Sequence, residues 1–148
     1  MQDIKKIMVP VDFSENSTKI LKSALFFANK CSATITIVYV LQSFEDYEGF
    51  FIPHMPVAQF ENEMLENAKT KMNSFIRENL APETPHETRV LSGDIAEELL
   101  NYAEKNAIDL IVMGTHGYKG VEKILFGSVA AQVVKNAPCP VMVINPYK

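Results

Sequence analysis

The chain has 148 residues, of which 47% are hydrophobic and 22% charged, so it is long enough for one domain around one core and unlike disordered chains. Its formal net charge is −4 at pH 7 and it contains no basic run, which argues against a nucleic-acid partner. No stretch approaches the roughly 18 apolar residues of a membrane span, and the N-terminus lacks the apolar stretch of a signal peptide. We therefore expect a cytoplasmic protein with no membrane partner.

The first third of the chain predicts a strand–helix–strand unit. Residues 7–11 are an apolar run typical of a strand buried on both faces, and Ser14 is a suitable N-cap for a following helix. From Ser17 onward apolar residues recur at helical spacing, and residues 33–41 (ATITIVYVL) are rich in β-branched residues. Two such strands on either side of an amphipathic helix favour a parallel sheet.

The remainder of the chain continues to alternate helices and strands. Asp94 and Glu97 have the spacing of a capping box, which marks the start of a helix. We expect helices over 57–80, 95–106 and 128–136, and strands over 88–91, 109–113 and 141–144. The pattern predicts an α/β, Rossmann-like fold, with an open parallel sheet of five strands and helices on both faces.

Residues 42–56 are irregular and contain several aromatic side chains, two prolines and an acidic group. We expect this segment to cover a cleft or a partner.

The segment GTHGYKGVEKILFGS, from Gly114 to Ser128, follows a predicted strand and opens a predicted helix. Glycine lacks the Cβ that would hold an anion away from the backbone, and a helix N-terminus offers free N–H groups and a positive dipole end. This pattern predicts a phosphate site. Lys119, Lys123 or His116 could neutralise the remaining charge, and the alternative is an ordinary loop between a strand and a helix.

Asp12 ends the first predicted strand. In a doubly wound sheet, ligands bind above the carboxyl ends of the strands where the strand order reverses. If the first and fourth strands are neighbours, Asp12 faces Gly114. Because a carboxylate repels phosphate, we expect Asp12 to accept hydrogen bonds from a ribose or a base. The alternative is that Asp12 only turns the chain before Ser14.

Other common sites have no counterpart in the sequence. Neither the P-loop pattern nor the G-x-G-x-x-G pattern is present. The three histidines lack metal-ligand spacing, and no nucleophile–base arrangement can be identified, so we predict no metal site and no catalytic residue. Cys31 and Cys139 are far apart, and we expect both to be buried thiols.

The run Gly114-x2-Gly117-x9-Gly127-Ser128, together with VPVDFS and APCPVMVI, resembles the ATP-binding class of the universal stress protein family along essentially the whole chain. The resemblance implies one domain over 1–148 with strand order 3-2-1-4-5. It also implies that Asp12 and the backbone near Val40 contact adenosine. The residues expected at the phosphates are Gly114, Gly117, Gly127, Ser128 and Val129, and Pro10, Met113 and Lys119 complete the expected site.

The resemblance also implies a function and a partner. The expected ligand is ATP, or ADP or AMP, with any Mg²⁺ carried by the nucleotide, in a regulatory module of the stress response. A homodimer through residues 141–144 is expected, and His116 stands where the family often has arginine, which would weaken phosphate binding or make it depend on pH. The alternatives are a slow ATP hydrolase or phosphotransferase and a nucleotide-free protein-interaction module.

Overall fold

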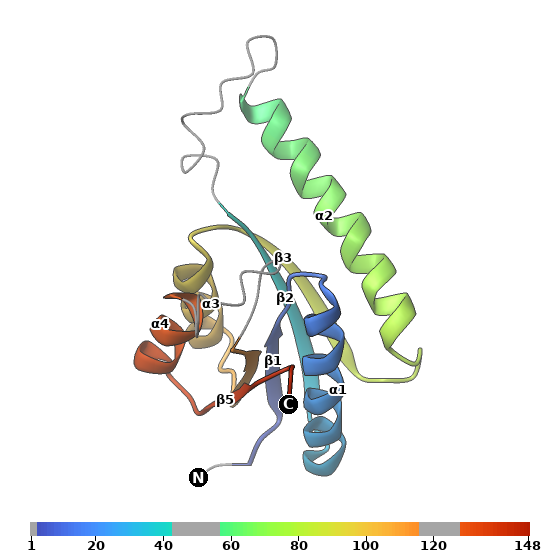
Figure 1. The fold of residues 1–148 in the computed structure, drawn as a ribbon, viewed down its shortest axis with the longest axis vertical. Coiled ribbons are helices and arrows are strands. Elements are labelled where there is room, and N and C mark those ends of the chain that lie inside the picture. Colours follow the sequence, from blue (N-terminus) through green and yellow to red (C-terminus); the bar gives the residue numbers. More distant parts are fainter. Residues whose placement is uncertain (1–2, 43–56, 116–127) are drawn as a thin grey trace.

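The computed structural model describes residues 3–42, 57–115 and 128–148, which form an α/β fold (Figure 1). The strands are β1 (Lys6–Pro10), β2 (Thr34–Gln42), β3 (His86–Gly93), β4 (Leu110–Gly114) and β5 (Val141–Ile144). The helices are α1 (Glu15–Cys31), α2 (Val57–Asn79), α3 (Ile95–Lys105) and α4 (Ser128–Asn136). The order of strands and helices agrees with that expected from the sequence.

All five strands form one parallel sheet in the order β3-β2-β1-β4-β5, which confirms the expected strand order. The central strand β1 pairs with β2 on one side, where Ile7 faces Ile35, and with β4 on the other, where Ile7 faces Leu110. Because β1 is covered on both faces, Ile7 and its two successors, Met8 and Val9, are completely buried.

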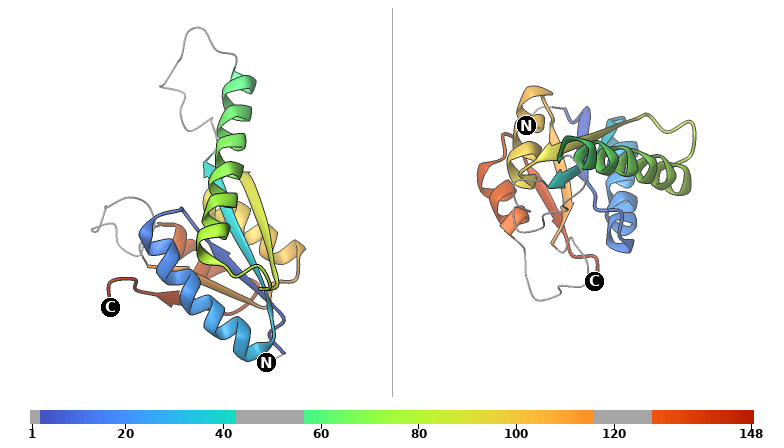
Figure 2. Two further views of the ribbon diagram at one scale, coloured as in Figure 1. Left: turned by 90° about the vertical axis from the view of Figure 1, so that its right-hand side faces the viewer. Right: turned by 90° about the horizontal axis from the view of Figure 1, so that it is seen from above.

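Helices cover both faces of the sheet, as Figures 1 and 2 show. Side chains of α1 and α2 share a core cluster with Ile7 and Val9, whereas side chains of α3 and α4 share the other cluster with Met8. This division follows from the alternation of side chains along a strand. The two helix layers therefore leave β1 in the middle of the molecule, with Asp12 just beyond its end.

The helix starts agree with the capping signals, with one difference in chemistry. Asp94 is the N-cap of α3, and its side chain accepts a hydrogen bond from the Glu97 backbone N at 3.0 Å. Ser14 is the N-cap of α1, as predicted, but its side chain makes no capping hydrogen bond. The Ser14 hydroxyl instead donates to Asp12.

Two expectations are corrected. The third strand is longer than residues 88–91, because β3 pairs with β2 along its whole length, from Ile35 opposite His86 to Gln42 opposite Gly93. The cysteines are free thiols but are only partly buried. Cys31 ends α1 and Cys139 lies between α4 and β5, so both are at the margins of the core.

Candidate functional site

The strand order reverses at β1, which lies between β2 and β4. The chain leaves β1 into α1 on one face of the sheet, and it leaves β4 toward α4 on the other face. This is the topological switch point at which open α/β sheets bind ligands. Asp12 follows β1, and Gly114 ends β4. The first and fourth strands are neighbours, which is the condition under which Asp12 is expected to face Gly114.

Asp12 is held in a tight turn between β1 and α1. Its Oδ1 accepts hydrogen bonds from the Ser14 backbone N at 2.9 Å, from the Ser17 hydroxyl at 2.7 Å, and from the Ser14 hydroxyl. Its backbone N donates to Ser17 Oγ at 2.9 Å. Asp12 therefore does organise the turn. All three of these donors bond the same carboxylate oxygen, Oδ1, and come from the N-terminus of α1.

Phe13 occupies an unusual backbone conformation in the same turn. Its φ is 65°, in the left-handed region that bulky residues rarely adopt. The Phe13 ring stacks on Tyr39, with centroids 4.6 Å apart, and meets Phe75 edge-on at 5.8 Å. Aromatic packing on the α1 and α2 side of the sheet thus offsets the strain of a turn that sets the direction of Asp12.

The other expected site residues in the described ranges lie near the ends of strands at the same edge of the sheet. Pro10 ends β1 opposite Val38, and Val40 lies two residues farther along β2. Val40 and Met113 are both buried in the core cluster on the α3 and α4 face, so either could contact a ligand only through its backbone. Gly114 faces Ile144 across the β4–β5 pair.

Ser128 and Val129 open α4. Ser128 is exposed, whereas Val129 is partly buried against the cluster that contains Val40 and Met113. The start of α4 therefore belongs to the same core cluster as residues from the ends of β2 and β4. Gly117, Lys119 and Gly127, with His116, lie outside the described residues, as do residues 43–56.

Ser17 is the residue that the sequence reasoning missed. The apolar periodicity places Ser17 only at the start of an amphipathic helix, yet the residue is 4% exposed, and its hydroxyl donates to the Asp12 carboxylate and accepts from the Asp12 backbone N. The available signal was a serine on a helix face otherwise filled by apolar residues such as Ile20, Leu21 and Ala24. A hydroxyl at such a position needs a polar partner nearby.

Within residues 3–42, 57–115 and 128–148, no three His, Cys, Asp or Glu side chains lie close enough together to hold a metal ion. No helix in the same ranges is both long and apolar enough to span a membrane. Away from the switch point, burial and then the negative charge of Asp109 raise the pKa of the Cys139 thiol, while a hydrogen bond with the Ile111 backbone opposes the shift.

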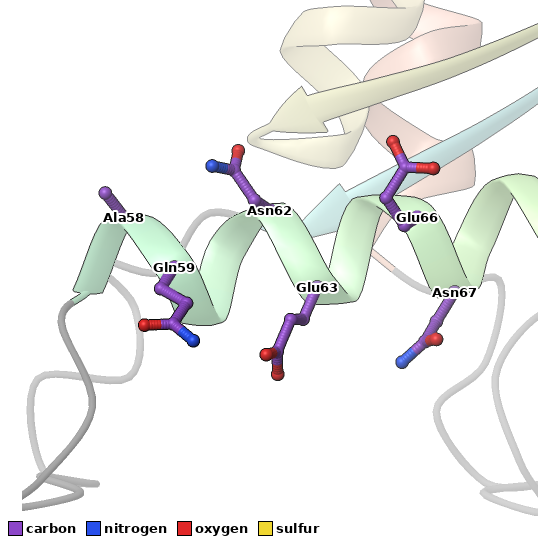
Figure 3. Close-up of a pocket in the computed structure, with 6 residues that line it drawn as sticks. All are labelled: Ala58, Gln59, Asn62, Glu63, Glu66 and Asn67. Carbon is purple, nitrogen blue, oxygen red and sulfur yellow. The ribbon is translucent and has the colours of Figure 1, made fainter.

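A surface depression of about 600 Å³ lies along the first part of α2 and does not coincide with the switch point. It is lined by Ala58, Gln59, Asn62, Glu63, Glu66 and Asn67, none of which was expected at the nucleotide site. Figure 3 shows that these side chains project from different sides of one helix. Because they come from a single helix and include two carboxylates, we do not assign a phosphate ligand to this surface.

Comparison with known proteins identifies the fold and the family. The model of the universal stress protein family matches residues 3–145. Universal stress protein MJ0531 of Methanocaldococcus jannaschii is 36% identical over 147 residues, which cover 97% of this chain and 84% of the relative. Protein MJ0577 of the same organism is 30% identical over 153 residues, which cover 95% and 94% of the two chains.

Solved structures agree with this assignment. The structure of MJ0577 has a TM-score of 0.81 and 29% identity, and the match covers 97% of each chain. A universal stress protein from Archaeoglobus fulgidus, solved in complex with dAMP, has a TM-score of 0.65 and 22% identity, with 97% of this chain and 99% of that one covered. The family model, which matches nearly the whole chain, and the relatives with 36% and 30% identity show that this chain belongs to the universal stress protein family.

Proposed function

We propose that this protein binds ATP or a closely related adenine nucleotide at the switch point and acts as a regulatory module of the stress response. The observation that carries the proposal is the pairing of β1 with β4, which brings Asp12 and Gly114 to adjacent strand ends. The segment that begins at Gly114 contains further glycines at Gly117 and Gly127 in the sequence, and α4 begins directly after it, at Ser128. The complex of the Archaeoglobus fulgidus protein with dAMP supports this class of ligand.

The two sides of the site are suited to different parts of a nucleotide. On the β1 and β2 side, the carboxylate of Asp12 would accept hydrogen bonds from adenosine, and the backbone around Pro10 and Val40 would supply further donors and acceptors. On the β4 and α4 side, backbone N–H groups and one hydroxyl would hold the phosphates. This second group comprises Met113, Gly114, Gly117, Lys119, Gly127, Ser128 and Val129, and Mg²⁺ would enter with the nucleotide.

Calorimetric titration of ATP into nucleotide-free protein tests the proposal. We expect a dissociation constant of about micromolar order, because three or four charge-assisted hydrogen bonds are sufficient for it. Gly127→Val should abolish binding, since its added methyl groups would occupy the space of a phosphate. Ala131→Val also introduces a valine, at an exposed position of α4, and should bind as the wild type does. Absence of binding by the folded wild type would refute the proposal.

We further propose that two copies pair through β5. This strand is at the edge of the sheet, and its four residues are apolar and only partly buried. The Pro140 and Ile144 carbonyls accept hydrogen bonds from Ile111 and Thr115, so the backbones of the alternate residues Val141 and Val143 face outward. An exposed apolar edge of this kind is satisfied by pairing with a second strand.

Sedimentation equilibrium tests the dimer with two variants at one position. Val143→Pro removes an outward N–H group but leaves the bonds to β4, and it should produce a monomer. Val143→Ala keeps that N–H group and should remain dimeric, with somewhat weaker association. A wild type that is monomeric at micromolar concentration would contradict the proposed interface.

A further inference from the structure

The hydroxyl groups of Ser14 and Ser17 both point to one atom, Oδ1 of Asp12. The Ser17 hydroxyl donates to this oxygen at 2.7 Å and also accepts from the Asp12 backbone N at 2.9 Å. It therefore bridges the carboxylate and the backbone N–H of Asp12. Ser14 adds a second hydroxyl donor and its backbone N–H, the latter at 2.9 Å. The carboxylate of Asp12 is therefore fixed in one orientation by groups of the α1 N-terminus.

Neither helix capping nor core packing accounts for the two serine hydroxyls. Ser14 occupies the N-cap position of α1, but its side chain makes no capping hydrogen bond. Ser17 lies on the buried face of α1 beside Ile20 and Leu21, where an apolar residue would satisfy packing alone. A buried hydroxyl is retained at little cost only when it is hydrogen-bonded, and here its hydrogen bonds join it to Asp12.

We propose that Ser14 and Ser17 are positioning residues of the nucleotide site, which hold the Asp12 carboxylate ready to accept a hydrogen bond from adenosine. This inference rests on the proposed function. A carboxylate on an unsupported loop loses rotational freedom when a ligand binds, whereas one that is already held does not. The two serines would thus raise affinity without contacting the nucleotide.

A double-mutant cycle for ATP affinity tests whether Ser17 acts through Asp12. The four proteins are the wild type, Ser17→Ala, Asp12→Ala and the double variant, each titrated with ATP by calorimetry. We expect Ser17→Ala to weaken binding about tenfold, a typical effect of one hydrogen bond to a charged group. In the Asp12→Ala background the same substitution should have no further effect.

Thr36→Val is the matched control, since Thr36 is also 4% exposed. Thr36 lies on β2 opposite Met8, and Met8 is four residues before Asp12 in the sequence, so this substitution removes a buried hydroxyl away from Asp12. It should lower stability by a similar amount and leave ATP affinity unchanged. A loss of affinity in Thr36→Val as large as that in Ser17→Ala would overturn the proposal, because the effect would then follow stability alone.

Ser14→Ala provides a second variant with less effect on the core, and it decides the question if Ser17→Ala does not fold. We expect it to weaken ATP binding about threefold, and only when Asp12 is present. Wild-type affinity in the folded serine variants, or an equal loss in both backgrounds, would overturn the positioning role while leaving nucleotide binding intact. A wild type that binds no adenine nucleotide would overturn both proposals.

Discussion

The ring of Phe13 stacks on the ring of Tyr39, with 4.6 Å between the centroids, while the Phe13 backbone has a φ of 65°. The turn after β1 thus combines a strained backbone with an anchored side chain. Because Asp12 immediately precedes Phe13, the stacking contact on β2 and the orientation of the carboxylate belong to one local structure.

This arrangement predicts an unusual order of stability at position 13. Phe13→Ala removes the ring but keeps a Cβ at positive φ, whereas Phe13→Gly removes both. We expect the glycine variant to be more stable than the alanine variant by about 1 kcal/mol in urea unfolding, although both should be less stable than the wild type. At the exposed α1 position Lys22, the order should be the usual one, with Lys22→Gly less stable than Lys22→Ala. The usual order at position 13 would disprove the strain.

Gly93, at the end of β3, is predicted not to tolerate a side chain. Its φ is 146°, and a Cβ there would lie 2.8 Å from Cγ of Glu98. Gly93→Ala should lower the free energy of unfolding by about 1 kcal/mol or more. The Gly93→Ala, Glu98→Ala double variant relieves the contact but not the backbone strain, so only part of the loss should be recovered. Complete recovery would show that the contact alone was responsible.

The cap of α3 is predicted to depend on an acceptor at position 94. Asp94→Ala leaves the Glu97 N–H without its partner and should lower the free energy of unfolding by about 1 kcal/mol. Asp94→Asn keeps an oxygen acceptor and should retain most of the stability. Equal losses in the two variants, measured by thermal unfolding, would indicate that charge rather than the hydrogen bond stabilises the helix start.

The Cys139 thiol is predicted to be less reactive in the folded protein than in the unfolded chain. Burial and the nearby Asp109 carboxylate raise the pKa of the Cys139 thiol. At a given pH, a smaller fraction of Cys139 is therefore thiolate in the folded protein than in the unfolded chain. In a Cys31→Ser background, the pH midpoint of iodoacetamide alkylation should lie higher for the folded protein than in urea. Asp109→Asn should lower the folded midpoint, since the amide removes the charge and keeps an oxygen acceptor for the Lys5 and Lys6 N–H groups. Identical folded and unfolded midpoints would contradict the shift.

The sequence predicted the fold well because the fold depends on periodic patterns. The buried run of β1, the amphipathic face of α1 and the capping pair Asp94 and Glu97 are local signals. Strand order followed only from the family resemblance, since neighbouring strands are set by contacts between distant segments. The extension of β3 to His86 depends on its pairing with β2 and has no local signal.

The candidate site was only partly predictable. Asp12 and Gly114 were expected at the ends of two strands because strand ends can be located along the chain, and in the structure Asp12 lies just beyond β1 and Gly114 ends β4. The hydrogen bonds from Ser14 and Ser17 to Asp12 could not be predicted. They depend on a turn with positive φ at Phe13, a conformation that composition does not suggest for phenylalanine. The partial exposure of Cys139 likewise depends on how the connection between α4 and β5 lies against the core.

NMR mapping tests most directly whether an adenine nucleotide binds where the strand order reverses. ATP would be titrated into nitrogen-15-labelled protein while backbone amide shifts are followed. We predict that the largest changes cluster at Asp12 to Ser14, Val40, Gly114 to Thr115 and Ser128 to Val129. Changes concentrated on the Ala58 to Asn67 part of α2, or no saturable changes at millimolar ATP, would contradict it.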